Sequence, residues 1–166
     1  LGLEMLDGYG MSENFAASPF SRPGKVRIGY VGSPVLGVQA RIADNGELEV
    51  KSAAQMLGYY KLPEKTQEEM TADGYFKTGD RGEIDAQGRL KITGRVKDLF
   101  KTSKGKYVAP VPIEQLLGRH SSLEAVCVVG SGQAQPLALV MLAPDAQSSL
   151  QDATAKMDLE IALKDL

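Results

Sequence analysis

Three short turn sequences separate pairs of strand-like segments along the chain. The turns are Asp44-Asn-Gly46, Asp85-Ala-Gln-Gly88 and Ser103-Lys-Gly105. Glycine supplies the positive φ that a tight hairpin turn requires, and apolar and polar residues alternate beside the first turn, as in a half-buried strand. The sequence therefore predicts three antiparallel hairpins.

The register of the second hairpin can be counted from its turn. If the turn is centred near Gln87, Asp80 lies opposite Gly94 or Arg95, because each is about seven or eight residues from that centre. The pair has two interpretations. It is an ion pair at the open end of the hairpin, or Asp80 accepts hydrogen bonds from a ribose diol while Arg95 donates to ribose or phosphate oxygens.

Proline and periodicity predict the helices. Residues 63–70 begin with proline at a helix-compatible first position, and residues 111–117 are entered through a proline, which favours a helix start in both segments. After Asp145, apolar residues recur at the spacing of one helical face, at Leu150, Ala153, Met157 and Ile161. The chain thus combines hairpins with short helices.

Two apolar runs, residues 123–129 and 137–142, predict buried strands. The single cysteine, Cys127, lies in the first run, where we expect a buried and inert thiol. The expected fold class is α+β. A small β-barrel-like subdomain ends near residue 96, and a βαββα domain covers residues 97–166.

Composition excludes several classes of protein. Nineteen Lys and Arg residues against 21 Asp and Glu residues give a net charge of −2, which does not indicate a nucleic-acid partner. The longest apolar run, residues 136–144, is shorter than the roughly 20 residues of a membrane-spanning helix. Peripheral membrane association stays open.

One cysteine among 166 residues agrees with a cytoplasmic protein. Because the chain begins with Leu1, we expect a piece of a longer protein.

Two further segments carry groups that can bind a nucleotide. Tyr9-Gly-Met-Ser-Glu13 offers a ring for a base, a hydroxyl for a phosphate oxygen and a carboxylate for Mg²⁺, or it is an ordinary loop. Four lysines near the third hairpin either attract a polyphosphate or form a solvated face, namely Lys97, Lys101, Lys104 and Lys106. His120 has no partner for a catalytic triad.

These segments, in this order, resemble the adenylate-forming (AMP-binding) enzymes, which include acyl-CoA synthetases, luciferases and the adenylation domains of peptide synthetases. Tyr9-Gly-Met-Ser-Glu13 is similar to the family's Tyr-Gly-x-Thr-Glu segment, and Gly58-Tyr-Tyr-Lys61 and Thr78-Gly-Asp80 follow at the family's spacing. Residues 94–114 are most similar to the long-chain fatty acyl-CoA synthetases, where Thr-Ser-x-Gly-Lys-x-Val-Ala-Pro-x-Pro-Ile-Glu is typical.

The resemblance implies an ATP-dependent ligase that uses Mg²⁺. ATP and a carboxylate would give acyl-AMP and pyrophosphate, and the thiol of coenzyme A would then displace AMP. By resemblance, Tyr9 would stack on adenine, Ser12 would contact phosphate and Glu13 would help to hold Mg²⁺. Asp80 would accept both ribose hydroxyls, and Arg95 would contact the ribose from the neighbouring strand.

The resemblance also assigns roles to the two parts of the chain. Residues 1–96 would end the large AMP-binding domain, and residues 97–166 would be the mobile C-terminal domain, truncated at its end. Lys97 matches the hinge position, which is more often Asp in relatives, so Asp98 is a second candidate. The hairpin at Gly105 would approach the tunnel for the pantetheine arm of coenzyme A, where glycine leaves room for the thiol.

The family's phosphate-binding loop and its adenylation lysine have no match in this chain. Lys156 and Lys164 lack the sequence setting of that lysine, so no catalytic residue is assigned. We therefore expect part of a long-chain fatty acid–CoA ligase, inactive as an isolated fragment. The alternatives are an enzyme that adenylates another acyl or aryl acid, and a non-catalytic binding module.

Overall fold

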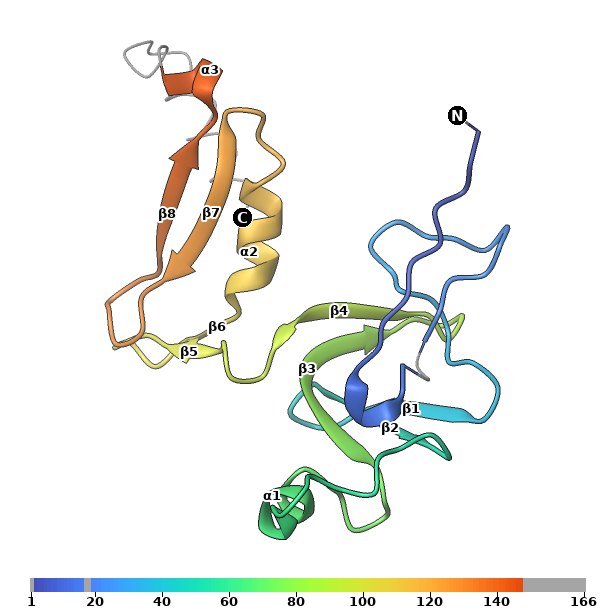
Figure 1. The fold of residues 1–166 in the computed structure, drawn as a ribbon. Helices are drawn as coiled ribbons and strands as arrows, with labels where there is room; N and C mark the ends of the chain where they lie inside the picture. Colours follow the sequence, from blue (N-terminus) through green and yellow to red (C-terminus); the bar gives the residue numbers. More distant parts are fainter. Residues whose placement is uncertain (1, 17–18, 148–166) are drawn as a thin grey trace. The chain divides into compact units, whose positions relative to one another are not determined.

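The structure is a computed structural model that describes residues 2–16 and 19–147 (Figure 1). The chain divides into two compact units, Leu1–Val96 and Lys97–Leu166. No helix in the described ranges is long and apolar enough to cross a membrane.

Unit 1 is built on a curled four-stranded antiparallel sheet (Figure 1). Its strands lie in the order of the sequence and are β1 (Val38–Ile42), β2 (Glu47–Ser52), β3 (Phe76–Ile84) and β4 (Leu90–Arg95). The first two predicted hairpins are confirmed as β1–β2 and β3–β4. The predicted helix at Pro63 is α1 (Pro63–Glu68), which lies between β2 and β3 in the sequence. The barrel-like closure expected from the sequence stays a prediction.

The core of unit 1 lies on the sheet. Leu48, Val50, Phe76 and Leu90 are buried together, and Tyr9 and Met11 from the N-terminal loops pack against them. Burying one such aliphatic or aromatic side chain contributes about 1.5–3 kcal/mol, so this small cluster is a main source of stability for the unit. The packing also brings the loop containing Tyr9 onto the sheet.

The segment before the sheet consists of loops joined by single bridges, with one short 3-10 helix, η1 (Ser12–Asn14). Phe20 is bridged to Gly8 and to Ser33, and Gly32 is bridged to Leu90 of β4. Gly32 has a φ of +100°, and a Cβ placed there would lie 2.0 Å from the carbonyl carbon of Phe20. Only glycine permits this approach, which attaches the loops to the sheet.

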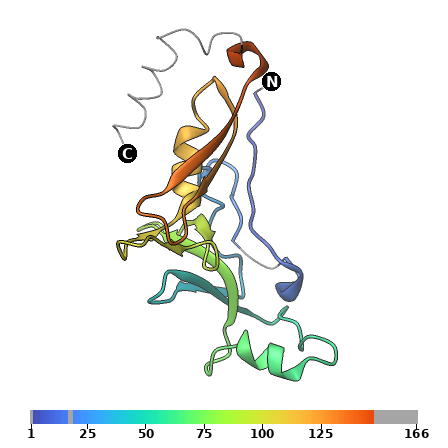
Figure 2. The same cartoon turned by 90° about the vertical axis from the view of Figure 1, so that its left-hand side faces the viewer.

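The described part of unit 2 contains two further hairpins and two helices. The elements are β5 (Phe100–Lys101), β6 (Tyr107–Val108), α2 (Pro110–Leu117), β7 (Leu123–Val129), β8 (Leu137–Leu142) and α3 (Pro144–Gln147). The third predicted hairpin, the proline-initiated helix and both strand predictions are confirmed. Figures 1 and 2 show α2 along one face of the β7–β8 pair. The helical pattern at Leu150, Ala153, Met157 and Ile161 lies outside the described residues.

The predicted burial of β7 and β8 is wrong. Leu123 and Val128 are buried, but Leu139 is 60% exposed and Met141 is 50% exposed. Cys127, predicted to be buried and inert, is exposed, and its register partner is Leu139. An apolar run shows that both faces of a strand are apolar, whereas burial depends on what covers each face. Within the described part, α2 packs against β7.

Candidate functional site

Three residues that the sequence marks as candidates come together in unit 1. Asp80 lies on β3, and its register partner on β4 is Arg95, one of the two positions that the turn count predicts. The Nε of Arg95 lies 3.3 Å from Oδ1 of Asp80. The hydroxyl of Tyr9 donates to Oδ2 of the same carboxylate at 2.6 Å. Asp80 therefore has one partner at each oxygen, across 71 residues in the case of Tyr9.

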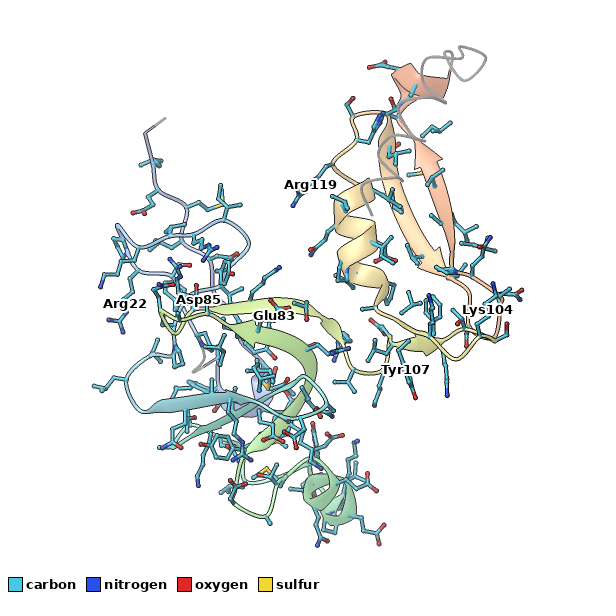
Figure 3. The ribbon with its side chains drawn as sticks, turned by 180° about the vertical axis from the view of Figure 1, so that it is seen from behind. Arg22, Glu83, Asp85, Lys104, Tyr107 and Arg119 are labelled. Atoms are coloured by element: carbon cyan, nitrogen blue, oxygen red, sulfur yellow. The ribbon has the colours of Figure 1, made fainter. Side chains whose placement is uncertain are left out.

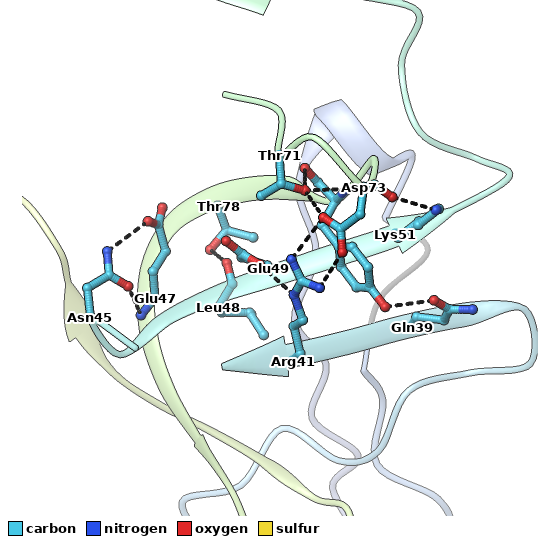
Figure 4. Close-up of polar contacts among 11 residues, drawn as sticks. Gln39, Arg41, Asn45, Glu47, Leu48, Glu49, Lys51, Thr71, Asp73 and Thr78 are labelled. Carbon is cyan, nitrogen blue, oxygen red and sulfur yellow. Dashed lines mark hydrogen bonds and ion pairs between the residues drawn. The ribbon is translucent and has the colours of Figure 1, made fainter. Parts of the chain in front are cut away.

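The local backbone fixes the direction of the Asp80 carboxylate. Gly79, with a φ of +73°, donates its N–H to Oε1 of Glu47 at 2.9 Å and accepts from the N–H of Val96 at 2.8 Å. The Asp80 N–H donates to the hydroxyl of Thr78 at 3.0 Å. That hydroxyl donates in turn to the carbonyl of Leu48 at 2.8 Å, a contact drawn in Figure 4. Residues 78–80 are thus held by hydrogen bonds to Glu47 and Leu48 of β2 and to Val96, which follows β4.

Burial and a hydrogen bond keep the hydroxyl of Tyr9 protonated. Burial, together with the hydrogen bond to Asp80, raises the pKa of Tyr9 well above its usual value, so its hydroxyl stays a donor near neutral pH. An ionised carboxylate has about four lone-pair directions, of which Tyr9 and Arg95 occupy one on each oxygen. Each oxygen of Asp80 can therefore accept one more hydrogen bond, which is the requirement of a vicinal diol.

The other two candidates of the N-terminal motif lie on η1. Ser12 is exposed, and its carbonyl accepts the N–H of Phe15 at 3.2 Å. Glu13 is half-buried, and Oε1 of its carboxylate accepts a hydrogen bond from the hydroxyl of Tyr59 at 3.0 Å. Its carbonyl accepts the N–H of Met56 at 2.7 Å. Glu13 is thus held through its main chain and its side chain.

Glu13 fits a magnesium ion that also binds substrate. Among the described residues, no group of three or more His, Cys, Asp and Glu side chains is arranged to hold a metal. Mg²⁺ is commonly bound through one or two carboxylates, with water and substrate phosphates as its other ligands. A single carboxylate whose Oε1 is already oriented by Tyr59 suits that kind of site.

The remaining candidates belong to unit 2. Lys97 and Asp98 lie in the turn that precedes β5, and both are exposed. Gly105 lies in the β5–β6 turn with a φ of +82°, and the nearest atom to a Cβ there would be the Cε of Lys101 at 3.9 Å. The turn conformation alone therefore favours glycine at this position.

The four lysines near this hairpin form an exposed surface. Lys97, Lys101, Lys104 and Lys106 are all exposed, which agrees with a solvated face. Figure 3 marks Lys104 at the turn and Tyr107 on the neighbouring strand. The Nζ of Lys101 lies 5.4 Å from the centre of the Tyr107 ring, within the range of a cation–π contact.

Sequence reasoning missed the residues that support the candidates. Tyr59 holds Glu13, Glu47 holds Gly79, and Thr78 holds Asp80. Tyr59 and Thr78 lie inside the motifs that carry the family resemblance, so the motifs did point to these segments. The hydrogen bond from Tyr59 to Glu13 joins residues 46 positions apart, and the one between Gly79 and Glu47 joins residues 32 positions apart. No local pattern in the sequence predicts pairings over such separations.

Comparison with known proteins gives consistent matches. Residues 97–162 match the family model of the AMP-binding enzyme C-terminal domain. The long-chain-fatty-acid–CoA ligase FadD15 of Mycobacterium bovis is 39% identical over 155 residues, which cover 93% of this chain and 26% of that protein. Long-chain-fatty-acid–CoA ligase 1 of Cavia porcellus is 35% identical over 159 residues, covering 89% and 23%. The chain spans about a quarter of the length of these curated relatives.

A solved structure extends the match to almost the whole chain. The anthranilate CoA ligase AuaEII in complex with anthranoyl-AMP aligns with a TM-score of 0.81 and 26% identity, covering 99% of this chain and 34% of that one. The antiparallel sheet of unit 1, the hairpins and helices of unit 2, and the ordered motifs thus agree with one family. The chain belongs to the adenylate-forming, AMP-binding enzymes, and residues 97–162 belong to their C-terminal domain.

Proposed function

We propose that this chain is part of an ATP-dependent ligase that joins a long-chain fatty acid to coenzyme A. The observation that carries the proposal is the carboxylate of Asp80, which is held by Tyr9 and Arg95 and keeps one acceptor direction free on each oxygen. This arrangement suits the ribose of a nucleotide. The names of the two curated relatives support a long-chain fatty acid as the second substrate.

The reaction has two half-reactions that share the nucleotide site. A carboxylate oxygen of the fatty acid attacks the α-phosphorus of ATP, and the bond to pyrophosphate breaks. The sulfur of coenzyme A then attacks the acyl carbon and loses its proton, and AMP leaves. In both, Asp80 accepts the two ribose hydroxyls, Arg95 donates to the ribose, and the Tyr9 ring lies beside the base.

Ser12 and Glu13 serve the phosphates in this proposal. The exposed hydroxyl of Ser12 donates to a phosphate oxygen. Glu13 would hold Mg²⁺, which supplies charge neutralisation at the phosphates when bound. Donors and charges that are already in place before the reaction lower its barrier, because they need no rearrangement as charge develops.

We further propose that the two units alternate between the half-reactions. Lys97, or its neighbour Asp98, is the hinge, and the hairpin at Gly105 approaches the pantetheine arm during thioester formation. Proteins use such domain rearrangements to present two sets of groups to one site. We place the enzyme in the cytoplasm, in agreement with its single cysteine in 166 residues.

A panel of carboxylic acids tests the proposal. The full-length protein that contains this chain is incubated with ATP, coenzyme A and acids of different length, and pyrophosphate and thioester are measured. We expect the highest kcat/KM for long-chain fatty acids. Absence of pyrophosphate release with every fatty acid would contradict the proposal.

The same panel separates a second candidate. The likeness to an anthranilate CoA ligase favours an aryl acid as the alternative substrate. A preference for aromatic acids over long-chain acids would select that candidate and retain the role of Asp80 in nucleotide binding.

The isolated 166-residue chain should not adenylate any acid. It spans about a quarter of the length of its curated relatives, and the affinity of a binding pocket depends on all of its walls. We expect no measurable heat of ATP binding by calorimetry at micromolar protein. Tight binding of ATP by this chain would contradict the expectation and show that these 166 residues form a nucleotide site by themselves.

A further inference from the structure

The contact between Tyr59 and Glu13 joins two parts of unit 1 that are 46 residues apart. The Tyr59 hydroxyl donates to Oε1 of Glu13 at 3.0 Å, and the Met56 N–H donates to the Glu13 carbonyl at 2.7 Å. The neighbouring Asn14 is fully buried and accepts a hydrogen bond from the hydroxyl of Ser52. Residues 52–59 therefore hold η1 through three hydrogen bonds.

Tyr59 is itself fixed by α1. Its N–H donates to the hydroxyl of Thr66 at 2.9 Å, and that hydroxyl donates to the carbonyl of Leu62 at 3.0 Å. A Cβ on Gly58 would lie 3.0 Å from Thr66, so glycine allows the chain to pass close to the helix. The backbone at Tyr59 is thus held against α1, which limits the positions that the Tyr59 ring can take.

The Tyr59 hydroxyl donates to only one of the two carboxylate oxygens of Glu13 in the contacts of the described residues. A carboxylate that accepts a hydrogen bond on Oε1 has its torsion fixed and keeps Oε2 for another ligand.

We propose that Tyr59 is a positioning residue that presents Glu13 to a divalent cation bound with nucleotide phosphates. The proposal rests on the role of Glu13 under the proposed function. Partners that hydrogen-bond to a metal-binding carboxylate orient it, and their loss commonly weakens metal affinity about 10- to 100-fold. Tyr59 does not contact the reacting atoms in this proposal and acts through Glu13 alone.

The test compares Tyr59→Phe with Tyr60→Phe in the full-length protein. Phenylalanine keeps the ring and removes only the hydroxyl. Tyr60 is a matched control, because it is the adjacent residue and is 85% exposed, and its ring faces Lys61 at 5.3 Å rather than an acid. The readout is the affinity for Mn²⁺ in the presence of a non-hydrolysable ATP analogue, measured by electron paramagnetic resonance.

We expect Tyr59→Phe to weaken Mn²⁺ binding about tenfold and Tyr60→Phe to leave it within about twofold of wild type. The Mg²⁺ concentration for half-maximal rate should rise in parallel, while kcat at saturating Mg²⁺ changes little. Unchanged Mn²⁺ affinity in Tyr59→Phe would overturn the proposal. An equal loss in both variants would also overturn it, because it would show a general effect of the segment.

Glu13→Gln separates this inference from the proposed function. If Glu13 holds the cation, Glu13→Gln weakens Mn²⁺ binding, and adding Tyr59→Phe has no further effect. Additive losses in the double variant would show that Tyr59 acts independently of Glu13. Full Mn²⁺ affinity in Glu13→Gln would instead reject the metal-binding role of Glu13, on which the proposal depends.

Discussion

At the scale of single residues, Asp80 makes the sharpest prediction. Its side chain is 18% exposed, and its carboxylate is paired with Arg95 and accepts a hydrogen bond from Tyr9. Asp80→Asn removes the charge and converts one oxygen into a donor, so one ribose hydroxyl loses its acceptor. Hydrogen bonds to charged groups contribute about 1.5–3 kcal/mol, so KM for ATP in the full-length protein should rise about 10- to 100-fold.

Glu83→Gln is the matched control for this substitution. Glu83 is an exposed acid on the same strand, opposite Lys91 in the register and marked in Figure 3. We expect KM for ATP to stay within about twofold of wild type, as for most exposed substitutions. A similar rise in both variants would indicate a general electrostatic effect of β3 and contradict a ribose contact by Asp80.

A second residue-scale prediction concerns pH. Arg41 of β1 pairs with Asp73 at 2.5 Å and with the buried Glu49 at 2.6 Å (Figure 4). Its guanidinium also stacks on the Tyr75 ring, 3.9 Å from the ring centre. The hydrogen bonds from Arg41, with a further one from Thr71, lower the pKa of Asp73 to about 2. A lowered folded-state pKa stabilises the fold above the unfolded value of about 3.9 and loses this effect below it.

The stability difference between wild type and Asp73→Asn should therefore depend on pH. Wild type should have the higher urea midpoint at pH 7, and the difference should shrink as pH falls from about 4 towards about 2. Urea denaturation at pH 7, 4 and about 2 measures this. A constant difference across the range would mean that Asp73 stabilises the loop through its shape rather than its charge.

At the scale of elements, local patterns gave the secondary structure and one register. Counting from the turn at Gln87 placed Asp80 opposite Gly94 or Arg95, and the structure pairs it with Arg95. A shift in register between Arg81 and Gly82 decides between the two positions, and a bulge of this kind has no signature in the turn. The contacts of Tyr9 and Tyr59 were not predicted, because tertiary packing rather than local spacing sets them.

The attachment of the N-terminal loops to β4 gives an element-scale prediction. Gly32→Ala would place a Cβ 2.0 Å from the backbone of Phe20, so the bridge from Gly32 to Leu90 must shift. We expect a loss of about 3 kcal/mol or more from the combined clash and backbone strain. The measurement is the free energy of unfolding from urea denaturation.

Gly37→Ala isolates the backbone contribution. Gly37 has a φ of +82°, and a Cβ there meets nothing within 4 Å, so only the conformational cost remains. We expect a loss of about 1 kcal/mol. Equal losses in the two variants would mean that the close approach at Gly32 contributes nothing beyond its φ.

At the scale of the whole molecule, the chain consists of two units, and the boundary between them along the sequence lies between Val96 and Lys97. The hinge candidates that the family resemblance implies, Lys97 and Asp98, lie next to this boundary. Burial in unit 2 was harder to predict. The apolar sequences of β7 and β8 show that both strands carry side chains suited to burial. Cys127 of β7 and Leu139 of β8 are nevertheless exposed, because burial depends on what covers each face of the strand pair.

The last prediction tests whether the joint is a hinge. Lys97→Pro fixes φ of residue 97 near −65° and restricts Val96, whose N–H is bonded to the Gly79 carbonyl at 2.8 Å. In the full-length enzyme, ATP–pyrophosphate exchange should fall less than about threefold, while thioester formation should fall at least about tenfold, because only the second half-reaction requires the rearrangement. Lys97→Ala removes the same charge and keeps the backbone free, so it should retain both activities. Equal loss of both half-reactions in Lys97→Pro would place the pivot elsewhere, and Asp98→Pro would then be the next variant to measure.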